Sequence, residues 1–229
     1  MELSLVIPFY NEERNVAEVL RILSAALDRK RIDYEILAVD NGSKDKTGEI
    51  IDSFSKRNRR IKKVLVKVNQ GYGFGINSGL KKCKGNYLGY LWGDNELPIE
   101  KTIEVYEALK SEKLDLCKVT RFNRGITLSR KISSKIYNLI MWVLFGIKSN
   151  DINGCPKIMR KEVYNAIRPV SKDWFLDPEI MIKCRRKLFK IKEIPVISGG
   201  RKKGKSNVRW TTAFEFIKNI LRYRFSKWE

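Results

Sequence analysis

Five short apolar runs alternate with amphipathic segments through the first half of the chain. These runs indicate buried strands because they are almost wholly apolar and are bounded by turn residues. They span Leu3–Ile7, Tyr34–Val39, Ile61–Val68, Tyr87–Trp92 and Leu114–Val119. Apolar positions at helical spacing predict helices after Asn11, over Asp45–Lys56, over Gly71–Lys82 and after Pro98. This alternation predicts an α/β fold with a mostly parallel, twisted sheet flanked by helices.

The second half of the chain breaks this rhythm. Its pattern predicts helices over Ser129–Phe145, Asp177–Phe189 and Trp210–Phe225, and strands over Gly154–Met159 and Ile191–Ile197. The first and last of these helices are amphipathic and basic. Because no segment has the composition of a linker, we expect one domain over residues 1–229.

Charge favours anionic partners, since the formal net charge is +21, from 47 Lys and Arg against 26 Asp and Glu. Nucleic acid is the weakest candidate, because the sequence shows no recognised nucleic-acid motif. The chain has no histidine, which excludes imidazole as acid, base or ligand. The four cysteines lack zinc-ligand spacing, so we expect reduced thiols in a cytosolic protein.

Neither a signal peptide nor a membrane span is expected. Pro8 closes the short apolar run at the N-terminus. The longest apolar stretch, Ile136–Ile147, is about half of the roughly 20 residues that a spanning helix needs.

Polar residues follow the first two predicted strands. Asn11 and Glu12 come after the first, and Asp40 to Ser43 after the second. Right-handed crossovers would bring these strand ends, and Asp94 after the fourth strand, to one edge of the sheet, where ligands bind in such folds. The alternative is a helix capped by Asn11, with Glu12 and Glu13 at its positive end, and an ordinary turn at Asp40.

A glycine-rich segment runs from Asn69 to Gly79 into the third predicted helix. Glycines there let the backbone approach a phosphate or sugar. A dinucleotide-binding loop fits poorly, because this segment follows the third strand and not the first.

Carboxylates offer candidates for metal binding and catalysis. Asp94 and Glu96 flank Asn95 at a strand end, where they could hold Mg²⁺ together with substrate phosphates, or form a solvated turn. Asp151, Asp177 and Glu179 are further candidates, although acids at a helix start also favour the helix dipole. A basic loop over residues 201–206 could bind phosphate or be a solvated face.

The combination is more specific than its parts. In order along the chain come P-x-x-N-E, D-N-G-S, N-x-G-x-G-x-G-x-N-x-G, G-D-N-E, D-x-N-G, D-P-E and E-I-P-V…R-x-x-G-x-S. This series resembles the family 2 glycosyltransferases with a GT-A fold, and more narrowly the dolichol-phosphate mannose synthase and polyprenyl-phosphate glycosyltransferase branch. The resemblance covers the chain from Leu3 to about Ser206.

The resemblance implies roles for individual residues. A nucleotide sugar would be bound by Pro8, Tyr10, Asn11, Glu12, Asp40, Asn41, Gly42, Ser43, Asn69, Gly71, Gly73 and Asn77. Asp94 and Glu96 would hold Mg²⁺ or Mn²⁺, and Asp94, Asp151 and Asp177 would serve catalysis. The acceptor phosphate would be held by Arg201, Lys202, Lys203, Lys205 and Ser206. The family's first metal-binding acid is replaced by Trp92, and Glu96 could restore the lost charge.

The implied activity is inverting transfer of a sugar from a GDP- or UDP-linked donor to a polyprenyl or dolichyl phosphate at the cytoplasmic membrane face. Residues 1–120 would bind the donor, and residues 121–207 the acceptor. The helix over residues 129–147 and the basic helix over 208–229 would lie in the bilayer interface. Many such relatives carry transmembrane helices after this point, and this chain ends without them, which suggests a membrane-anchored partner subunit.

Two other functions remain open. A sugar-hydroxyl acceptor would need a carboxylate base, with Asp151 and Asp177 the leading candidates. A phosphate acceptor needs none, because its second pKa is about 6. The third possibility is a non-catalytic nucleotide-sugar-binding protein, which the loss of the acid at Trp92 motivates.

Overall fold

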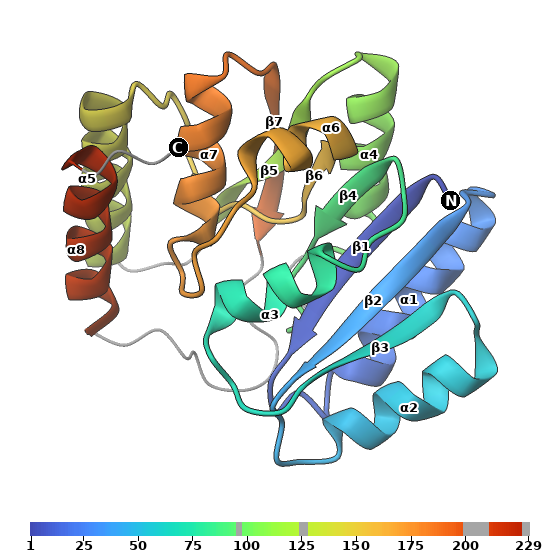
Figure 1. Ribbon diagram of the computed structural model, residues 1–229. Helices are drawn as coiled ribbons and strands as arrows, with labels where there is room; N and C mark the ends of the chain where they lie inside the picture. The colour runs from blue at the N-terminus through green and yellow to red at the C-terminus, as the bar shows by residue number, and fades with distance from the viewer. Residues whose placement is uncertain (95–97, 124–127, 199–210, 226–229) are drawn as a thin grey trace.

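A computed structural model describes residues 1–94, 98–123, 128–198 and 211–225 (Figure 1). The strands are β1 (Leu3–Phe9), β2 (Tyr34–Asn41), β3 (Ile61–Val66), β4 (Tyr87–Tyr90), β5 (Leu116–Asn123), β6 (Lys157–Arg160) and β7 (Ile191–Ser198). The helices are α1 (Val16–Arg29), α2 (Thr47–Arg57), α3 (Tyr72–Leu80), α4 (Lys101–Ser111), α5 (Leu128–Phe145), α6 (Lys161–Ile167), α7 (Leu176–Arg186) and α8 (Thr211–Phe225).

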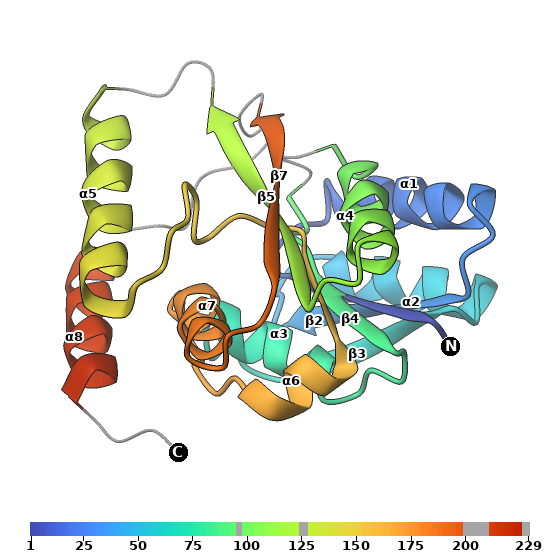
Figure 2. The ribbon, with the colours of Figure 1, turned by 90° about the horizontal axis from the view of Figure 1, so that it is seen from above.

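The strands form one sheet in the order β3-β2-β1-β4-β6-β5-β7. Only β6 runs antiparallel to its neighbours, β4 and β5, and the remaining pairs are parallel. Helices α3, α6 and α7 lie on one face, and α1, α2 and α4 on the other (Figure 2). The mostly parallel sheet flanked by helices is therefore confirmed, and the carboxyl ends of β1, β2 and β4 meet at one edge.

The core is built on β1 and β2, as their apolar sequences predict. Every residue of β2 is buried, and only Pro8 of β1 is partly exposed. Helix α3 packs closely on these strands because Gly79 has no side chain. A Cβ atom there would lie 2.4 Å from a methyl carbon of Val6.

Three details differ from the sequence predictions. Asn11 does not cap α1, because its backbone is left-handed (φ 54°) and its side chain accepts a hydrogen bond from the amide of Lys44 instead. Helix α4 begins at Lys101, after a turn that follows Pro98. Helix α6 was not predicted, because its seven residues follow β6 directly without a turn sequence.

Helices α5 and α8 lie side by side at the end of the molecule beyond α7 (Figures 1 and 2). Helix α5 lies outside the layers of the sheet and its flanking helices. It carries a group of large apolar side chains that are exposed to solvent. These are Ile132, Ile136, Leu139, Ile140, Trp142, Val143 and Leu144. We refer to them as the α5 apolar face.

Among the residues that the structure describes, no helix is long and apolar enough to cross a membrane. The four cysteines are free thiols.

Candidate functional site

The loops after β1 and β2 are joined at the carboxyl edge of the sheet. The amide of Asn11 donates to Ser43 Oγ at 3.1 Å, and the amide of Glu12 donates to Thr47 Oγ1 at 2.9 Å. In register, Pro8 lies opposite Val39, and Phe9 lies opposite Asp40. The structure thus brings together the two groups of residues that the strand ends predicted, from Pro8 to Glu12 and from Asp40 to Ser43.

Asp40 is buried at this edge, with 6% of its surface exposed. Its Oδ1 accepts a hydrogen bond from the amide of Ser43 at 3.0 Å. Two glycines near Asp40 have no room for a side chain. A Cβ on Gly42 would lie 2.5 Å from the Asn69 nitrogen, and a Cβ on Gly48 would lie 2.4 Å from Asp40 Oδ2. The Asp40 carboxylate is therefore held in one place by close-packed backbone.

The glycine segment packs against backbone of the segment before α7. Cβ atoms on Gly71 and Gly73 would lie 2.5 Å from the carbonyl oxygens of Lys172 and Ser171 respectively. The amide of Phe74 donates to Lys172 O at 2.8 Å, and the side chain of Asn77 donates to Ser171 O at 3.0 Å. Close approach to protein backbone thus explains these glycines, and their contact with a phosphate or sugar stays a prediction.

The segment before α7 also reaches α8. Asp173 Oδ2 accepts a hydrogen bond from the side chain of Asn219 at 2.8 Å. On the other side of the glycine segment, the amide of Asn69 lies against Gly42, and its Oδ1 accepts from the amide of Gly71 at 2.8 Å. The Asn41 side chain donates to Gly71 O at 3.2 Å, while its Oδ1 is buried with no protein partner in the described part of the chain.

Asp94 follows β4 at the same edge. The amide of Leu91 continues the pairing with Val6 O at 3.1 Å, and a Cβ on Gly93 would lie 2.5 Å from the ring of Phe9. Glu96, the second predicted ligand, lies outside the described residues. Within the described ranges, no three Cys, Asp or Glu side chains form a metal-binding group. One carboxylate fits Mg²⁺ or Mn²⁺ nevertheless, because such ions take one or two carboxylates and complete their shell with phosphates and water.

Trp92 connects several elements beside Asp94. Its indole ring lies under the guanidinium of Arg121, at 4.5 Å from carbon to centroid. Its ring N–H donates to the hydroxyl of Tyr72 at 2.9 Å. Tyr72 stacks on Trp174, with centroids 4.4 Å apart and planes 13° from parallel. The sequence identifies Trp92 only as the residue that replaces the family's first metal-binding acid, because nothing in the local sequence indicates these distant partners.

Asp151 is held by Arg121 in a two-point ion pair. Arg121 Nε donates to Oδ2 at 2.7 Å and Nη2 to Oδ1 at 3.0 Å, and the Arg121 amide adds a third hydrogen bond at 3.1 Å. Burial alone would raise the pKa of Asp151, but the hydrogen bonds and charge of Arg121, with the charge of Lys118, leave this pKa below its ordinary value. Asp151 is thus an ionised anchor for Arg121.

Asp177 lies in the interior, beneath the site. Its Oδ1 accepts from Lys157 Nζ at 2.5 Å and from the hydroxyl of Tyr90 at 2.7 Å, and the residue is 2% exposed. Burial raises the pKa of Tyr90, and the charge of Asp177 raises it further, so this hydroxyl stays protonated and donates. Glu179 is buried too and accepts from the amides of Val170 and Ser171.

A second ion pair, between a buried lysine and a partly exposed glutamate, lies next to the first. Lys118 is fully buried and pairs with Glu193 at 3.1 Å, and it also donates to the backbone oxygen of Asp151 at 2.5 Å. Burial lowers the pKa of Lys118, and the charge of Glu193 opposes that change.

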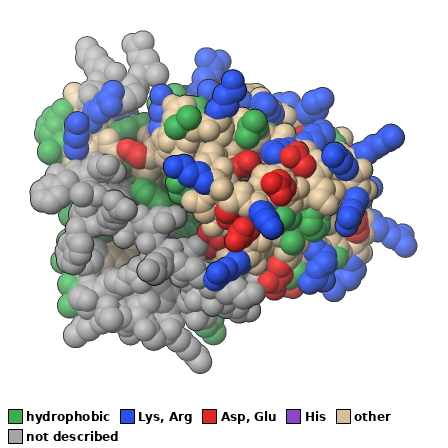
Figure 3. Space-filling model, turned by 90° about the horizontal axis from the view of Figure 1, so that it is seen from below, with side chains coloured by type: hydrophobic (Ala, Val, Ile, Leu, Met, Phe, Trp, Pro, Cys, Tyr) green, Lys and Arg blue, Asp and Glu red, His purple; other side chains and the backbone are tan. Residues whose placement is uncertain are grey.

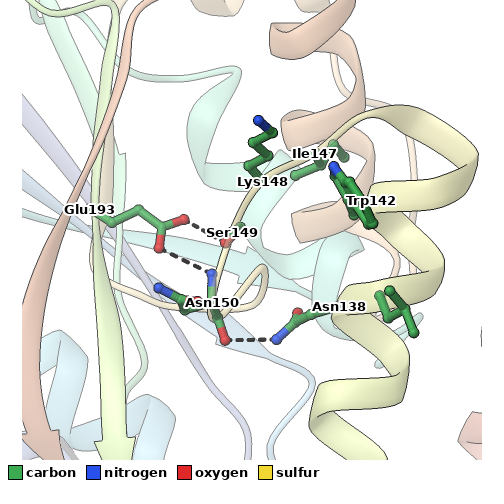
Figure 4. A pocket seen from close by; sticks show the side chains of 8 residues that line it. Asn138, Trp142, Ile147, Lys148, Ser149, Asn150 and Glu193 are labelled. Carbon is green, nitrogen blue, oxygen red and sulfur yellow. Dashed lines mark hydrogen bonds between the residues drawn. The ribbon is translucent and has the colours of Figure 1, made fainter.

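An open pocket of about 420 Å³ lies between α5 and the segment over residues 147–150 (Figure 4). Leu139, Trp142 and Ile147 provide apolar wall, and Glu193 lies at its polar end, where it accepts from Ser149 Oγ and the Asn150 amide. Ser149 Oγ also accepts from the amide of Asp151 at 3.3 Å. The pocket therefore joins the α5 apolar face to the segment that carries Asp151.

The surface seen from below the view of Figure 1 has a mixed charge (Figure 3). Acidic side chains gather over the middle of the described part of this face, and lysines and arginines lie around them. The predicted acceptor loop, with Arg201, Lys202, Lys203, Lys205 and Ser206, lies outside the described residues.

Known proteins resemble this chain in sequence and in fold. The family model described as Glycosyl transferase family 2 matches residues 4–168. An uncharacterised glycosyltransferase of Synechocystis sp. is 33% identical over 73% of this chain and 53% of its own length. A dolichol-phosphate mannosyltransferase of Pyrococcus furiosus is 28% identical over 100% of this chain and 65% of its own length. The chain thus spans between half and two thirds of these relatives.

A solved structure shares the fold. Glucosyl-3-phosphoglycerate synthase from Mycobacterium tuberculosis, in complex with Mn²⁺ and UDP-glucose, has a TM-score of 0.74 and 17% identity, over 97% of this chain and 78% of that one. The fold of this chain is therefore the GT-A fold.

Asp177→Leu should destabilise the protein by about 3–5 kcal/mol, because it leaves the Lys157 ammonium buried without its partner. The double variant Lys157→Met/Asp177→Leu should lose less, since it leaves no lone charge. Urea unfolding measures both. Lys30→Ala, which breaks the exposed pair with Glu107, is the control and should cost about 1 kcal/mol or less. If the double variant were less stable than Asp177→Leu, the unpaired charge of Lys157 would not be the cause of the instability.

Asp151→Asn should remove a pH-dependent part of the stability. The pKa of Asp151 is lower in the folded protein than in the unfolded chain, where it is about 3.9. Its ionised form therefore stabilises the fold at higher pH, and this contribution disappears as pH falls through the folded pKa. The difference in free energy of unfolding between wild type and variant should be largest near pH 7 and shrink by about pH 3. A difference that stays constant with pH would refute this.

Proposed function

The chain belongs to glycosyl transferase family 2, and from that membership we propose that it transfers a sugar from a nucleotide diphosphate sugar to a polyprenyl phosphate. Transfer takes place at the cytoplasmic face of a membrane, to which the protein binds peripherally. The reaction inverts the configuration at the anomeric carbon of the sugar. The relative from Pyrococcus furiosus, named for a dolichol-phosphate acceptor, matches the whole chain and supports this class of acceptor.

One observation carries the choice of a lipid acceptor, namely the α5 apolar face. Three of its side chains, Ile136, Trp142 and Val143, are 49–67% exposed. An exposed apolar patch of this kind indicates a contact surface, and basic residues on the same helix, such as Lys135, suit anionic lipid headgroups. The pocket between α5 and Glu193 continues this apolar surface toward Asp151, so a prenyl chain held at α5 would bring its phosphate to the site.

The ion pairs of Asp151 and Asp177 also favour a phosphate acceptor over a sugar hydroxyl. A hydroxyl acceptor needs a general base with free access to it. Asp151 is engaged at both oxygens by Arg121, and Asp177 is buried against Lys157. A phosphate monoester is already ionised near neutral pH, because its second pKa is about 6. Positioning and charge neutralisation then suffice for the reaction.

The mechanism follows from these roles. The carboxyl edge around Asp40 and Asn41 would hold the nucleoside, and the basic loop over residues 201–206 would hold the acceptor phosphate. A phosphate oxygen attacks the anomeric carbon as the bond from that carbon to the diphosphate breaks, and the electron pair leaves with the diphosphate. Asp94, with Glu96, would hold Mg²⁺ or Mn²⁺, which would neutralise the leaving diphosphate.

Transfer is tested with radiolabelled UDP- and GDP-linked sugars, membranes, and Mg²⁺ or Mn²⁺, followed by extraction into organic solvent. We expect label in an acid-labile lipid, and at least about 100-fold less with Asp94→Ala, since charge stabilisation of the leaving group is lost. Asp52→Ala on α2, whose exposed carboxylate pairs with Lys63, is the matched control and should stay active. No transfer from any donor would refute the enzymatic proposal, and full activity of Asp94→Ala would refute the metal assignment.

Membrane contact is tested by flotation with vesicles that contain anionic lipid and no protein. Ile136→Glu and Val143→Glu should each weaken vesicle binding about tenfold or more, because an apolar side chain is worth about 1.5–3 kcal/mol on burial. Leu65→Glu, at an exposed position on the distant edge strand β3, is the control with the same charge change. Wild-type protein that binds membranes but not these vesicles would instead indicate a membrane-anchored partner subunit.

A further inference from the structure

Trp92 is tied to Asp94 by a stiff piece of chain. Only Gly93 separates the two residues, and it packs so closely on β1 that a Cβ would lie 2.5 Å from the ring of Phe9 and 3.0 Å from Pro8 O. A shift of the Trp92 backbone would therefore move the Asp94 backbone as well.

One side of the indole fixes Arg121. The guanidinium lies 4.5 Å from the ring centroid and is held in place by its two hydrogen bonds to Asp151. Such a cation–π contact adds to the ion pair, because the indole face attracts positive charge. The contact joins the segment after β4 to β5 and to the loop that carries Asp151.

The edge of the indole fixes Tyr72, the first residue of α3. The N–H donates to the Tyr72 hydroxyl at 2.9 Å, and the Tyr72 ring stacks on Trp174 before α7. Burial raises the pKa of Tyr72 well above its usual value, so the hydroxyl remains neutral and can accept this bond at physiological pH. Trp92 thus contacts the glycine segment on one side and the Asp151 segment on the other.

An acid at position 92 would not simply extend the metal site. A carboxylate there would face the Arg121 guanidinium and compete with Asp151 for it, since opposite charges within about 4 Å attract strongly in a partly buried site. It would also leave the Tyr72 hydroxyl without its indole donor.

We propose that Trp92 is a positioning residue for the transfer reaction: it holds Tyr72 and Arg121 in fixed relation to Asp94 and acts on the rate of transfer through them, without contributing to metal affinity. This inference rests on the function proposed above. It explains the tryptophan at the first position of the family's acidic motif as a residue that positions groups of the same site.

Matched variants separate the contacts of Trp92. Trp92→Phe keeps a ring under Arg121 and removes the N–H, and Tyr72→Phe removes the acceptor of the same hydrogen bond. Each should lower kcat about three- to tenfold, as expected for one lost hydrogen bond, with KM for the nucleotide sugar changed less than about twofold. The double variant should be no slower than Tyr72→Phe alone, because both changes break one shared contact.

Trp92→Asp tests the metal part of the inference. It should lower kcat about 100-fold, since displacement of reacting groups by about 1 Å can cost this much, and it should leave the midpoint of the Mg²⁺ or Mn²⁺ titration unchanged or higher. Tighter metal binding by Trp92→Asp would overturn the inference. If Trp92→Asp does not fold, the kinetics of Trp92→Phe and Tyr72→Phe still test the inference.

A purely structural part for Trp92 would give a different result. Tyr87→Phe is the control: Tyr87 lies in the edge-to-face pair with Tyr106 at the opposite end of β4, and the variant makes the same chemical change as Tyr72→Phe but should leave kcat unaltered.

Trp92 variants that lose stability in urea but keep kcat would overturn the inference while leaving the proposed function intact. Wild-type protein that neither binds UDP or GDP nor transfers sugar would overturn both.

Discussion

Two fully buried lysines set the constraint on which the centre of this structure depends. Lys118 of β5 and Lys157 of β6 lie directly opposite each other in an antiparallel pair, so their side chains point to the same side of the sheet. Like charges in the interior repel strongly, and each ammonium needs a carboxylate and further hydrogen bonds to be tolerated. Glu193 from β7 and Asp177 from α7 supply the carboxylates, and carbonyls of Asp151 and Ile152 complete the arrangement.

This requirement determines how the second half of the chain is arranged. The loop before β6 must bring the Asp151 carbonyl to Lys118, and this places the Asp151 side chain where Arg121 can bind it. Helix α7 must bring Asp177 under β4, and this places Trp174 against Tyr72. The charges in the interior therefore position the aromatic and guanidinium groups around Trp92, although neither buried lysine contacts Trp92 in any interaction described here.

The sequence predicted the helices and strands better than the contacts around the site, for physical reasons. Wholly apolar runs such as Leu3–Ile7 predict buried parallel strands. The polar residues after them could be placed at the carboxyl edge of the sheet from topology alone. Lys118 and Lys157 gave no such signal, because a lysine in a basic chain looks like part of the solvated surface. Asn11 looked like a helix cap, but its side chain is bound across the loop by Lys44. The contact between Trp92 and Tyr72 joins residues 20 positions apart and has no local pattern.

The backbone over residues 171–173 lies between the glycine segment at the start of α3 and helix α8. On one side, Gly71 and Gly73 come so close to it that only hydrogen atoms fit between the chains, and on the other side Asp173 is bound by Asn219 of α8. Side chains in contact can exchange rotamers to absorb a displacement, but two main chains in contact cannot. A displacement of residues 171–173 would therefore be passed on to the start of α3 as a rigid movement, whereas a displacement of α8 reaches them through the hydrogen bond between the Asn219 and Asp173 side chains, which can absorb part of it.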